Sequence, residues 1–192
     1  MKPKTWFISD THFMHQNVAL LRGYSSYEEQ DLDILDKWNS MIDYEDTVYH
    51  LGDLTMKAIN NPYVWTMLCG LHGHKHLILG NHDKIHPGLK RPDGDKFREY
   101  LEFFDTVGTF SKYNDGPFQS VLSHFPYDTE GQWMQFAPKD LGKLLIHGHT
   151  HSSEKVSYSK KGTPQINVCW EAWGRPIELG EVKQLWNNIK SS

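Results

Sequence analysis

Five short polar clusters, each directly after an apolar run, hold the residue types that can do chemistry. In chain order they are Asp10-Thr11-His12, Gly52-Asp53, Gly80-Asn81-His82-Asp83, Ser123-His124 and His147-Gly148-His149-Thr150-His151. Each cluster is a weak signal alone, because Asp, Asn and Gly also end strands at ordinary turns. Together they supply carboxylate, amide and imidazole donors without a thiolate. That mixture suits borderline divalent ions such as Mn, Fe, Ni or Zn better than a closed structural zinc site.

The clusters contain more donors than one ion needs. The candidate metal ligands are Asp10, His12, Asp53, Asn81, His124, His149 and His151. If one carboxylate bridges, this set gives two divalent ions four protein ligands each and leaves positions open for water and substrate. Two ions ~3.5–4 Å apart stabilise both the attacking and the leaving oxygen in an in-line displacement at phosphorus. The chain holds 12 histidines among its 192 residues, which agrees with a metal centre rich in imidazole.

The elements that must position these clusters alternate between strands and helices in the first half. Apolar runs predict strands at 4–9, 46–50 and 77–79, and helical periodicity predicts helices at 25–42 and 62–69. The first helix has an N-cap at Ser25-Ser26, and Glu28 and Glu29 lie in its first turn. This alternation is typical of parallel α/β sheets, which bind ligands at the carboxyl ends of their strands.

The second half has a different pattern. A hairpin is predicted from 104–113 and 118–123, a strand at 144–147, a second hairpin from 156–158 and 165–169, and a short helix at 179–189. No repeat or linker divides the chain, so we expect a single domain over residues 1–192. The fold class predicted from the pattern is α/β, with two packed sheets and helices outside.

The five clusters in this order resemble the signature of the calcineurin-like metallophosphoesterase superfamily, D-x-H, G-D, G-N-H-D/E, H and G-H-x-H. The flanking segments SDTHFMHQNV, DTVYHLGDL, LILGNHD, HFPYD and INVCWEAWGRPIEL are similar to small single-domain members common in bacteria and their phages. The resemblance implies a four-layer α/β/β/α sandwich of two packed mixed sheets flanked by helices.

The resemblance also implies a role for each matched residue. One ion would be held by Asp10, His12, Asp53 and His151, and the other by Asp53, Asn81, His124 and His149. Asp53 would bridge the two ions, and a bridging hydroxide would be the nucleophile. His82 matches the non-ligand histidine that assists the leaving group, and Asp83 would hold the loop or orient His82.

We therefore expect a binuclear metal-dependent phosphohydrolase that cleaves small phosphodiesters, including cyclic nucleotides. The alternative is a metal-dependent nuclease or nucleic-acid end-processing enzyme, because repair nucleases of the same superfamily begin with a similar D-x-H segment. A net charge of −4 and the absence of a basic run count against it, so nucleic acid is expected as a partner only as substrate. A non-catalytic metal-binding scaffold is the third reading, and the intact His82 disfavours it.

The composition bears on location. No run approaches the ~20 apolar residues of a membrane span, and the start of the chain lacks the apolar core of a signal peptide. Cys69 and Cys169 show no framework spacing, which is typical of reduced thiols. We expect a cytoplasmic protein, bacterial or in a phage-infected host, with a small phosphate ester as its partner and no membrane contact. No pattern indicates an oligomeric state.

The remaining histidines and the aromatic residues carry weaker predictions. His15 and His50 fit either support of metal ligands or simple packing. The tract at 71–76 is interpreted as the turn before the third strand, His147 as a hydrogen-bonded strand residue and His86 as a surface residue. Three further sets complete the predictions: core tryptophans (Trp6, Trp38, Trp65), walls of the substrate site (Phe13, Tyr127, Trp133), and arginines able to meet a phosphate (Arg22, Arg91). The segment 170–173 is expected to pack.

Overall fold

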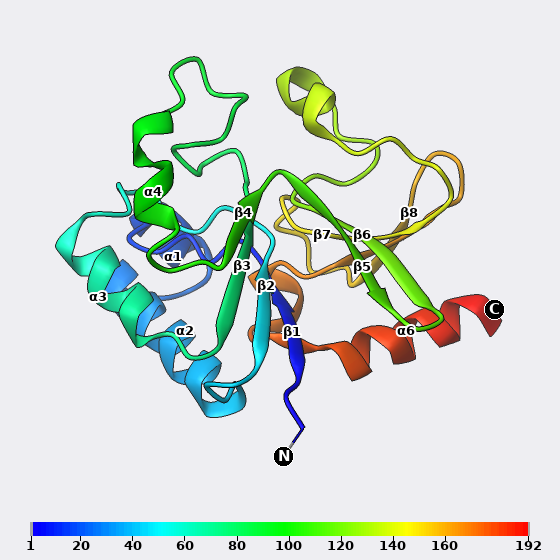
Figure 1. Ribbon diagram of the computed structural model, residues 1–192, viewed down its shortest axis with the longest axis horizontal. Helices are drawn as coiled ribbons and strands as arrows, with labels where there is room; N and C mark the ends of the chain where they lie inside the picture. Colours follow the sequence, from blue (N-terminus) through cyan, green and yellow to red (C-terminus); the bar gives the residue numbers. More distant parts are fainter. Residues whose placement is uncertain (1, 192) are drawn as a thin grey trace.

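The computed structural model describes residues 2–191, and its first sheet carries three of the five polar clusters. The strands are β1 (Thr5–Ile8), β2 (Thr47–His50), β3 (His74–Ile78), β4 (Thr106–Gly108) and β10 (Ile177–Glu178), in the order β10-β1-β2-β3-β4. β1 to β4 are parallel neighbours, and β10 is antiparallel to β1. In Figure 1, β1 rises from the N-terminus at the bottom, so the clusters follow the upper edge of this sheet.

The second sheet carries the other two clusters. Its strands are β5 (Phe110–Asp115), β6 (Phe118–Ser123), β7 (Leu144–His147), β8 (Val156–Tyr158) and β9 (Pro164–Asn167), in the order β5-β6-β7-β9-β8. β6, β7 and β9 are parallel, whereas β5 and β8 are antiparallel edge strands. Both sheets are therefore mixed, as predicted.

The helices begin where capping chemistry places them. They are α1 (Gln16–Leu21), α2 (Tyr27–Met41), α3 (Pro62–Gly70), α4 (Phe97–Tyr100), α5 (Trp170–Trp173) and α6 (Leu179–Ser191), with 3₁₀ turns η1 (Gly94–Lys96) and η2 (Gly131–Phe136). The Ser26 side chain caps α2 by accepting from the Glu29 amide, and Asn61 caps α3 with Pro62 in its first turn. Both predicted helices of the first half are confirmed.

Alternate residues of β1 serve two cores, which is how the layers are held together. Trp6 and Ile8 pack against α2 and α3 in the first core, whereas Phe7 faces the second core between the two sheets. The second core is closed from below by α6, whose Val182 is fully buried. Figure 1 shows α2 and α3 outside the first sheet and α6 beneath the second. The predicted sandwich of two mixed sheets flanked by helices is confirmed.

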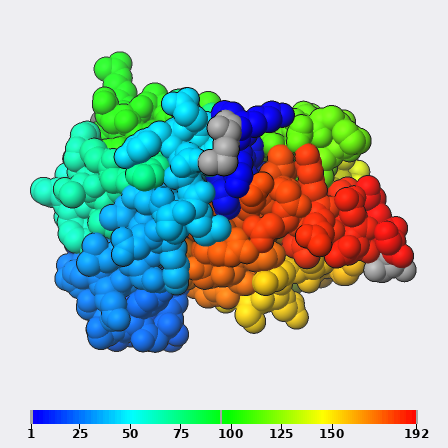
Figure 2. Space-filling model, turned by 90° about the horizontal axis from the view of Figure 1, so that it is seen from below, coloured from blue at the N-terminus to red at the C-terminus, as the bar shows by residue number. Residues whose placement is uncertain are grey.

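The view from below shows the face opposite the strand ends that carry the clusters. There the first described residues of the chain (dark blue) lie between the light-blue segment at the end of α2 and the C-terminal helix (red) (Figure 2). The described residues next to both ends therefore lie away from the polar clusters. Within residues 2–191, no helix combines the length and the apolar character needed to cross a bilayer.

Three predictions about elements were wrong. The expected strand at 104–113 is two strands, because β4 pairs with β3 in the first sheet while β5 pairs with β6 in the second. β3 begins at His74 rather than at residue 77, so part of the histidine tract is strand and not turn. Trp65, which was expected in the core, is 39% exposed. Its ring contacts Phe103 edge to face at the margin of the first core.

Candidate metal centre

The loops after β1 and β2 run side by side and turn sharply at their functional residues. The Asp10 and His12 amides donate to the carbonyls of Gly52 and Asp53, at 2.9 and 3.0 Å. Asp10, His12 and Asp53 all have left-handed backbone φ, between 50° and 58°. His149 and His151, after β7, have φ of 73° and 49°. Non-glycine residues rarely adopt this region, and they persist there only when the surrounding structure holds them.

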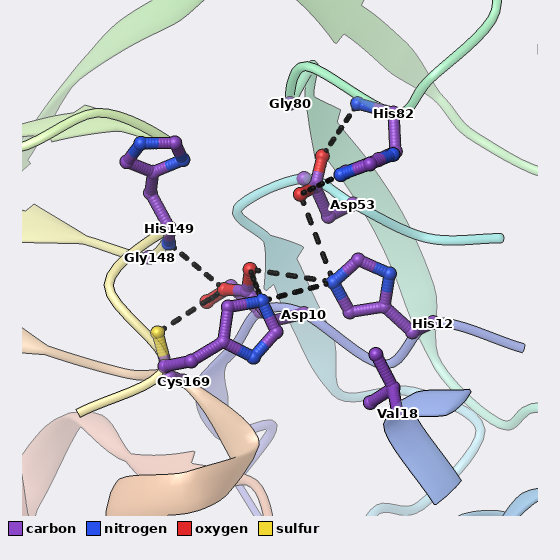
Figure 3. Close-up of polar contacts among 12 residues, drawn as sticks. Asp10, His12, Val18, Asp53, Gly80, His82, Gly148, His149 and Cys169 are labelled. Atoms are coloured by element: carbon purple, nitrogen blue, oxygen red, sulfur yellow. Dashed lines mark hydrogen bonds and ion pairs between the residues drawn. The ribbon is translucent and has the colours of Figure 1, made fainter. Parts of the chain in front are cut away.

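One group of four side chains converges in the space that these loops enclose. A donor atom from each of Asp10, His12, Asp53 and His151 lies within 4.8 Å of the others. The Asp10 Oδ1 atom is 3.8 Å from His12 Nε2 and 3.5 Å from His151 Nε2. Figure 3 shows the Asp10 and Asp53 carboxylates both facing the same nitrogen of the His12 ring, Nε2. This is the ligand set predicted for the first ion.

A second group lies on the other side of Asp53. His124 Nε2 is 3.1 Å from Asn81 Oδ1, 3.2 Å from His149 Nδ1 and 3.5 Å from Asp53 Oδ2. The same Asp53 Oδ2 is 3.7 Å from His12 Nε2 in the first group. The structure thus brings all seven predicted ligands together, with Asp53 in the shared position.

Three glycines of the motifs permit this close approach. A Cβ atom on Gly80 would lie 2.2 Å from Asp53 Oδ1, and one on Gly148 would lie 2.6 Å from Asp10 Oδ2. Gly52 has a φ of +92°, and a Cβ there would lie 2.4 Å from the Gly80 amide nitrogen. A larger residue at Gly80 or Gly148 would displace a carboxylate, and one at Gly52 would displace the Gly80 backbone and the His124 ring.

The two oxygens of Asp10 have different environments, and this tests the fit of a cation. Oδ2 accepts hydrogen bonds from the Ser9 hydroxyl, the His149 amide at 3.0 Å and the Cys169 thiol at 3.2 Å. Oδ1 is buried and has no hydrogen-bond partner. It faces two imidazole nitrogens, and a buried carboxylate oxygen without a partner is costly. A divalent ion among these O and N donors would satisfy it, so the residues fit a metal.

The pKa values of Asp10, His12 and His149 favour ligand forms, whereas neighbouring carboxylates raise the pKa values of His124 and His151 despite their burial. Burial raises the pKa of Asp10, but the facing His124, His12 and His151 outweigh it, so the net pKa of Asp10 is lowered. Burial also lowers the pKa of His12 well below its usual value and that of His149 to about 4. Both rings are therefore neutral at pH 7 and have a lone pair for a metal. Burial next to the Asp10 charge raises the pKa of Asp53 to about 6, despite the opposing effect of His124; a bound cation would stabilise its charged form.

Comparison with known proteins identifies this arrangement. Residues 4–169 match the calcineurin-like phosphoesterase superfamily domain, and the matched segment includes every residue of both groups. The chain belongs to this superfamily. It is thus a metallophosphoesterase, a hydrolase that acts on phosphate esters.

Two relatives cover nearly the whole phosphoesterase. The Gene 66 protein of Mycobacterium phage L5 is 35% identical over 198 residues, covering 96% of this chain and 95% of the relative. An uncharacterized protein of Methanocaldococcus jannaschii is 29% identical over 187 residues, covering 95% and 90%. A solved structure, a protein of unknown function from Aquifex aeolicus, has a TM-score of 0.68 at 28% identity and covers 96% of this chain and 100% of its own. The fold of the phosphoesterase is thus shared with proteins of phages, bacteria and archaea.

His82 lies at the rim of the phosphoesterase site. Its amide donates to Asp53 Oδ1 at 2.8 Å, and its Nε2 is 4.0 Å from Asp53 Oδ2 (Figure 3). The side chain is 40% exposed, so it can meet a substrate arriving from solvent. Asp83 beside it is fully buried and accepts from the amides of Gly80, Asp53 and Leu54. Asp83 therefore ties the His82 loop to the loop after β2.

The other histidines near the site have structural partners. His50 accepts from the Gly52 amide and bonds Thr11, and His15 caps α1 with its ring 5.4 Å from that of His12. His147 is buried and bonds the Gly148 carbonyl through Nδ1. The prediction that His86 lies on the surface was wrong. It is fully buried because Phe125, Trp133 and Phe136 surround its ring, and its Nδ1 accepts from the Gly88 amide.

Two predicted substrate walls were also wrong. Phe13 is fully buried in the first core. Tyr127 is buried on the outer side of the second sheet, where its amide donates to Gln165 and its hydroxyl to the Lys143 carbonyl. Trp133 stacks on Phe125, whose ring lies 5.0 Å from His149, so it remains near the site as a candidate wall.

Arg22 and Glu171 are functional neighbours that the sequence did not reveal. Arg22 was expected to meet a phosphate, but only 5% of its side chain is exposed and it points into the protein behind the site. Glu171 was expected only to pack, whereas its Oε1 lies 2.7 Å from His151 Nδ1. No local pattern distinguishes these residues, because the contact between them joins positions 149 residues apart in the sequence.

Proposed function

We propose that the protein is a binuclear metal-dependent phosphohydrolase of small phosphodiesters, including cyclic nucleotides. The observation that carries the proposal is the position of Asp53 between two groups of ligands. Asp10, His12 and His151 are suited to hold one ion with Asp53, and Asn81, His124 and His149 to hold the other. When bound, two such ions supply the Lewis acidity that activates water and stabilises negative charge at phosphorus.

The protein's own residues divide the remaining work. The Asp53 carboxylate is held by the His82 amide at one oxygen, which leaves the other oxygen directed at both groups. His82 is free of a ligand role and stands at the open rim. Burial lowers its pKa, so near neutral pH the ring is uncharged, and its N–H can stabilise the charge that develops on the leaving oxygen by donating a hydrogen bond.

Small substrates fit the surroundings better than a polymer. Half-exposed His82 marks an open rim, and the net charge of −4 supplies no attraction for a polyanion. Two divalent ions would make the cleft itself positive, which favours a single phosphate group. Hydrolysis of a phosphate ester expels one leaving oxygen, and the non-ligand imidazole of His82 at the rim can donate a hydrogen bond to it.

The test is a panel of substrates with the Mn²⁺-, Ni²⁺- or Zn²⁺-loaded protein. We expect hydrolysis of bis-p-nitrophenyl phosphate and of 2′,3′- or 3′,5′-cyclic nucleotides, and loss of both on chelation. His82→Ala should lower the cyclic nucleotide rate by about 10²–10⁴-fold. The loss for bis-p-nitrophenyl phosphate should be smaller, because p-nitrophenolate leaves without a proton.

The matched control is His74→Ala, since His74 is exposed at the far end of β3 and its side chain pairs with Asp105, away from the ligands. Its rates should equal those of the natural protein. Absence of hydrolysis with every metal rejects the proposal. Equal losses for both substrates in His82→Ala reject the leaving-group role, and cleavage of single-stranded DNA alone establishes a nuclease instead.

A further inference from the structure

Glu171 and Arg22 form an ion pair directly behind the first group of ligands. Glu171 lies in α5, beyond the segment matched by the superfamily, and Arg22 follows α1. The Glu171 Oε1 atom accepts a hydrogen bond from Arg22 Nε at 2.8 Å and forms an ion pair with the NH2 group of Arg22 at 2.7 Å. Only 5% and 19% of the two side chains are exposed, so solvent screens the pair weakly.

The same Glu171 oxygen fixes the state of the His151 ring. It is 2.7 Å from His151 Nδ1, a distance that requires a proton on that nitrogen, because a carboxylate oxygen only accepts. The lone pair of the neutral ring then lies on Nε2, which faces Asp10 Oδ1 at 3.5 Å. A carboxylate that accepts from the far nitrogen of a ligand histidine orients the ring and raises its basicity towards a metal.

Arg22 also binds the backbone of the loop after β1, in which Asp10 and His12 have left-handed φ. Its NH2 group donates to the Asp10 carbonyl at 2.6 Å, and its NH1 group donates to the Thr11 carbonyl at 3.2 Å. NH1 also donates to Gln30 of α2, whose amide group reaches the His12 carbonyl. The loop that Arg22 binds is the one in which Asp10 and His12 have left-handed φ.

We propose that Glu171 and Arg22 are positioning residues that set the metal affinity of the group Asp10, His12, Asp53 and His151. The inference rests on the proposed metal centre and adds residues outside its ligand set. Neither side chain belongs to the group of four donor atoms that lie within 4.8 Å of one another. Glu171 determines which ring nitrogen of His151 is free to bind a metal. Arg22 binds Glu171 and also donates to the backbone carbonyls of Asp10 and Thr11, so it holds the two segments together. In the second group, the His124 ring is oriented instead by the Leu51 carbonyl oxygen, which lies 2.7 Å from His124 Nδ1.

The experiment is a calorimetric titration of the full chain with Zn²⁺, which measures the affinity of each Zn²⁺ site. Glu171→Leu should weaken one of two Zn²⁺ sites by about 10–100-fold and leave the other unchanged. Glu171→Gln, which keeps an oxygen acceptor, should lose less. The control is Glu181→Leu, which breaks the Arg175–Glu181 ion pair of similar geometry without contact to the site. Its two affinities should equal those of the natural protein.

Nitrogen-detected NMR of the natural protein gives a readout that does not depend on a variant folding. His151 should carry its proton on Nδ1, both with and without Zn²⁺, and Glu171→Gln should populate the other tautomer in the metal-free protein. A neutral His151 ring that carries its proton on Nε2 and none on Nδ1 in the natural metal-free protein overturns the inference. So does an unchanged Zn²⁺ affinity in folded Glu171→Leu, and if the natural protein then still hydrolyses phosphodiesters, the proposed function stands without it. Failure of the natural protein to bind Zn²⁺ or another divalent ion overturns both.

Discussion

Replacing Gly80 with alanine should inactivate the enzyme without removing any functional group. Gly80 does not have left-handed φ, so alanine suits its backbone and the penalty is steric. The new Cβ would lie 2.2 Å from Asp53 Oδ1 and 2.5 Å from the Asp53 amide nitrogen, so about 1 Å of movement is needed to reach ordinary contact. Misplacement of a reacting group by about 1 Å costs roughly 10²-fold in rate. Overpacking of this kind also costs about 1–3 kcal/mol of stability.

The assay compares kcat/KM for bis-p-nitrophenyl phosphate at saturating Mn²⁺ with the midpoint of thermal unfolding. Gly94→Ala is the matched control, because a Cβ at Gly94 meets nothing within 4 Å and its φ is also outside the left-handed region. We expect Gly80→Ala to lose about 10²-fold in kcat/KM while Gly94→Ala stays at the natural rate. If folded Gly80→Ala hydrolyses the substrate within about twofold of the natural rate, Asp53 does not need its present position and the reasoning fails.

Two further predictions concern metal number and pH. His124→Ala should reduce the bound Mn²⁺, measured by equilibrium dialysis, from two ions to one, because His124 is the central donor of the second group. The control His74→Ala should still bind two ions. If His124→Ala also binds two ions, the second group is not a metal site. Burial lowers the pKa of His86 to about 4, so the folded state stays unprotonated there while the unfolded state takes up a proton below its usual pKa of about 6.5. The contribution of His86 to stability is therefore complete above pH 6.5 and is lost by about 1.4 kcal/mol per pH unit as the pH falls towards 4. Urea unfolding of the metal-free protein should show a shallower pH dependence in His86→Gln, and equal slopes would contradict the assignment.

The ligand set could be predicted from the sequence because it follows from strand ends. Asp10, Asp53 and Asn81 each come directly after an apolar strand, and parallel neighbours bring their carboxyl ends to one edge. The remaining ligands were predicted from the order of the five clusters along the chain, which matches the superfamily signature. The same logic failed at 104–113, because the hydrophobic pattern of a segment does not tell which sheet a strand joins, and this segment crosses from the first sheet to the second.

The supporting residues could not be predicted because their roles arise only from tertiary contacts. His86 is a polar residue in a loop, and only the aromatic rings of 125, 133 and 136 make it a buried one. Glu171 lies in an aromatic segment that is typical of packing, yet it contacts a histidine 20 positions away and an arginine from the start of the chain. Sequence spacing carries no information on such pairs.

The left-handed backbone at the ligands also determines which substitutions report on chemistry alone. Alanine at Asp10 or Asp53 would remove a carboxylate and also place a residue that disfavours φ near +55°, at a cost of about 1–2 kcal/mol. Asparagine tolerates that region as well as aspartate does. The loops therefore accept Asp→Asn as a change of charge with an intact turn, whereas alanine scanning would mix lost metal binding with a collapsed loop. The same backbone preference restricts which substitutions at Asp10 and Asp53 could abolish metal binding during evolution and still preserve the fold.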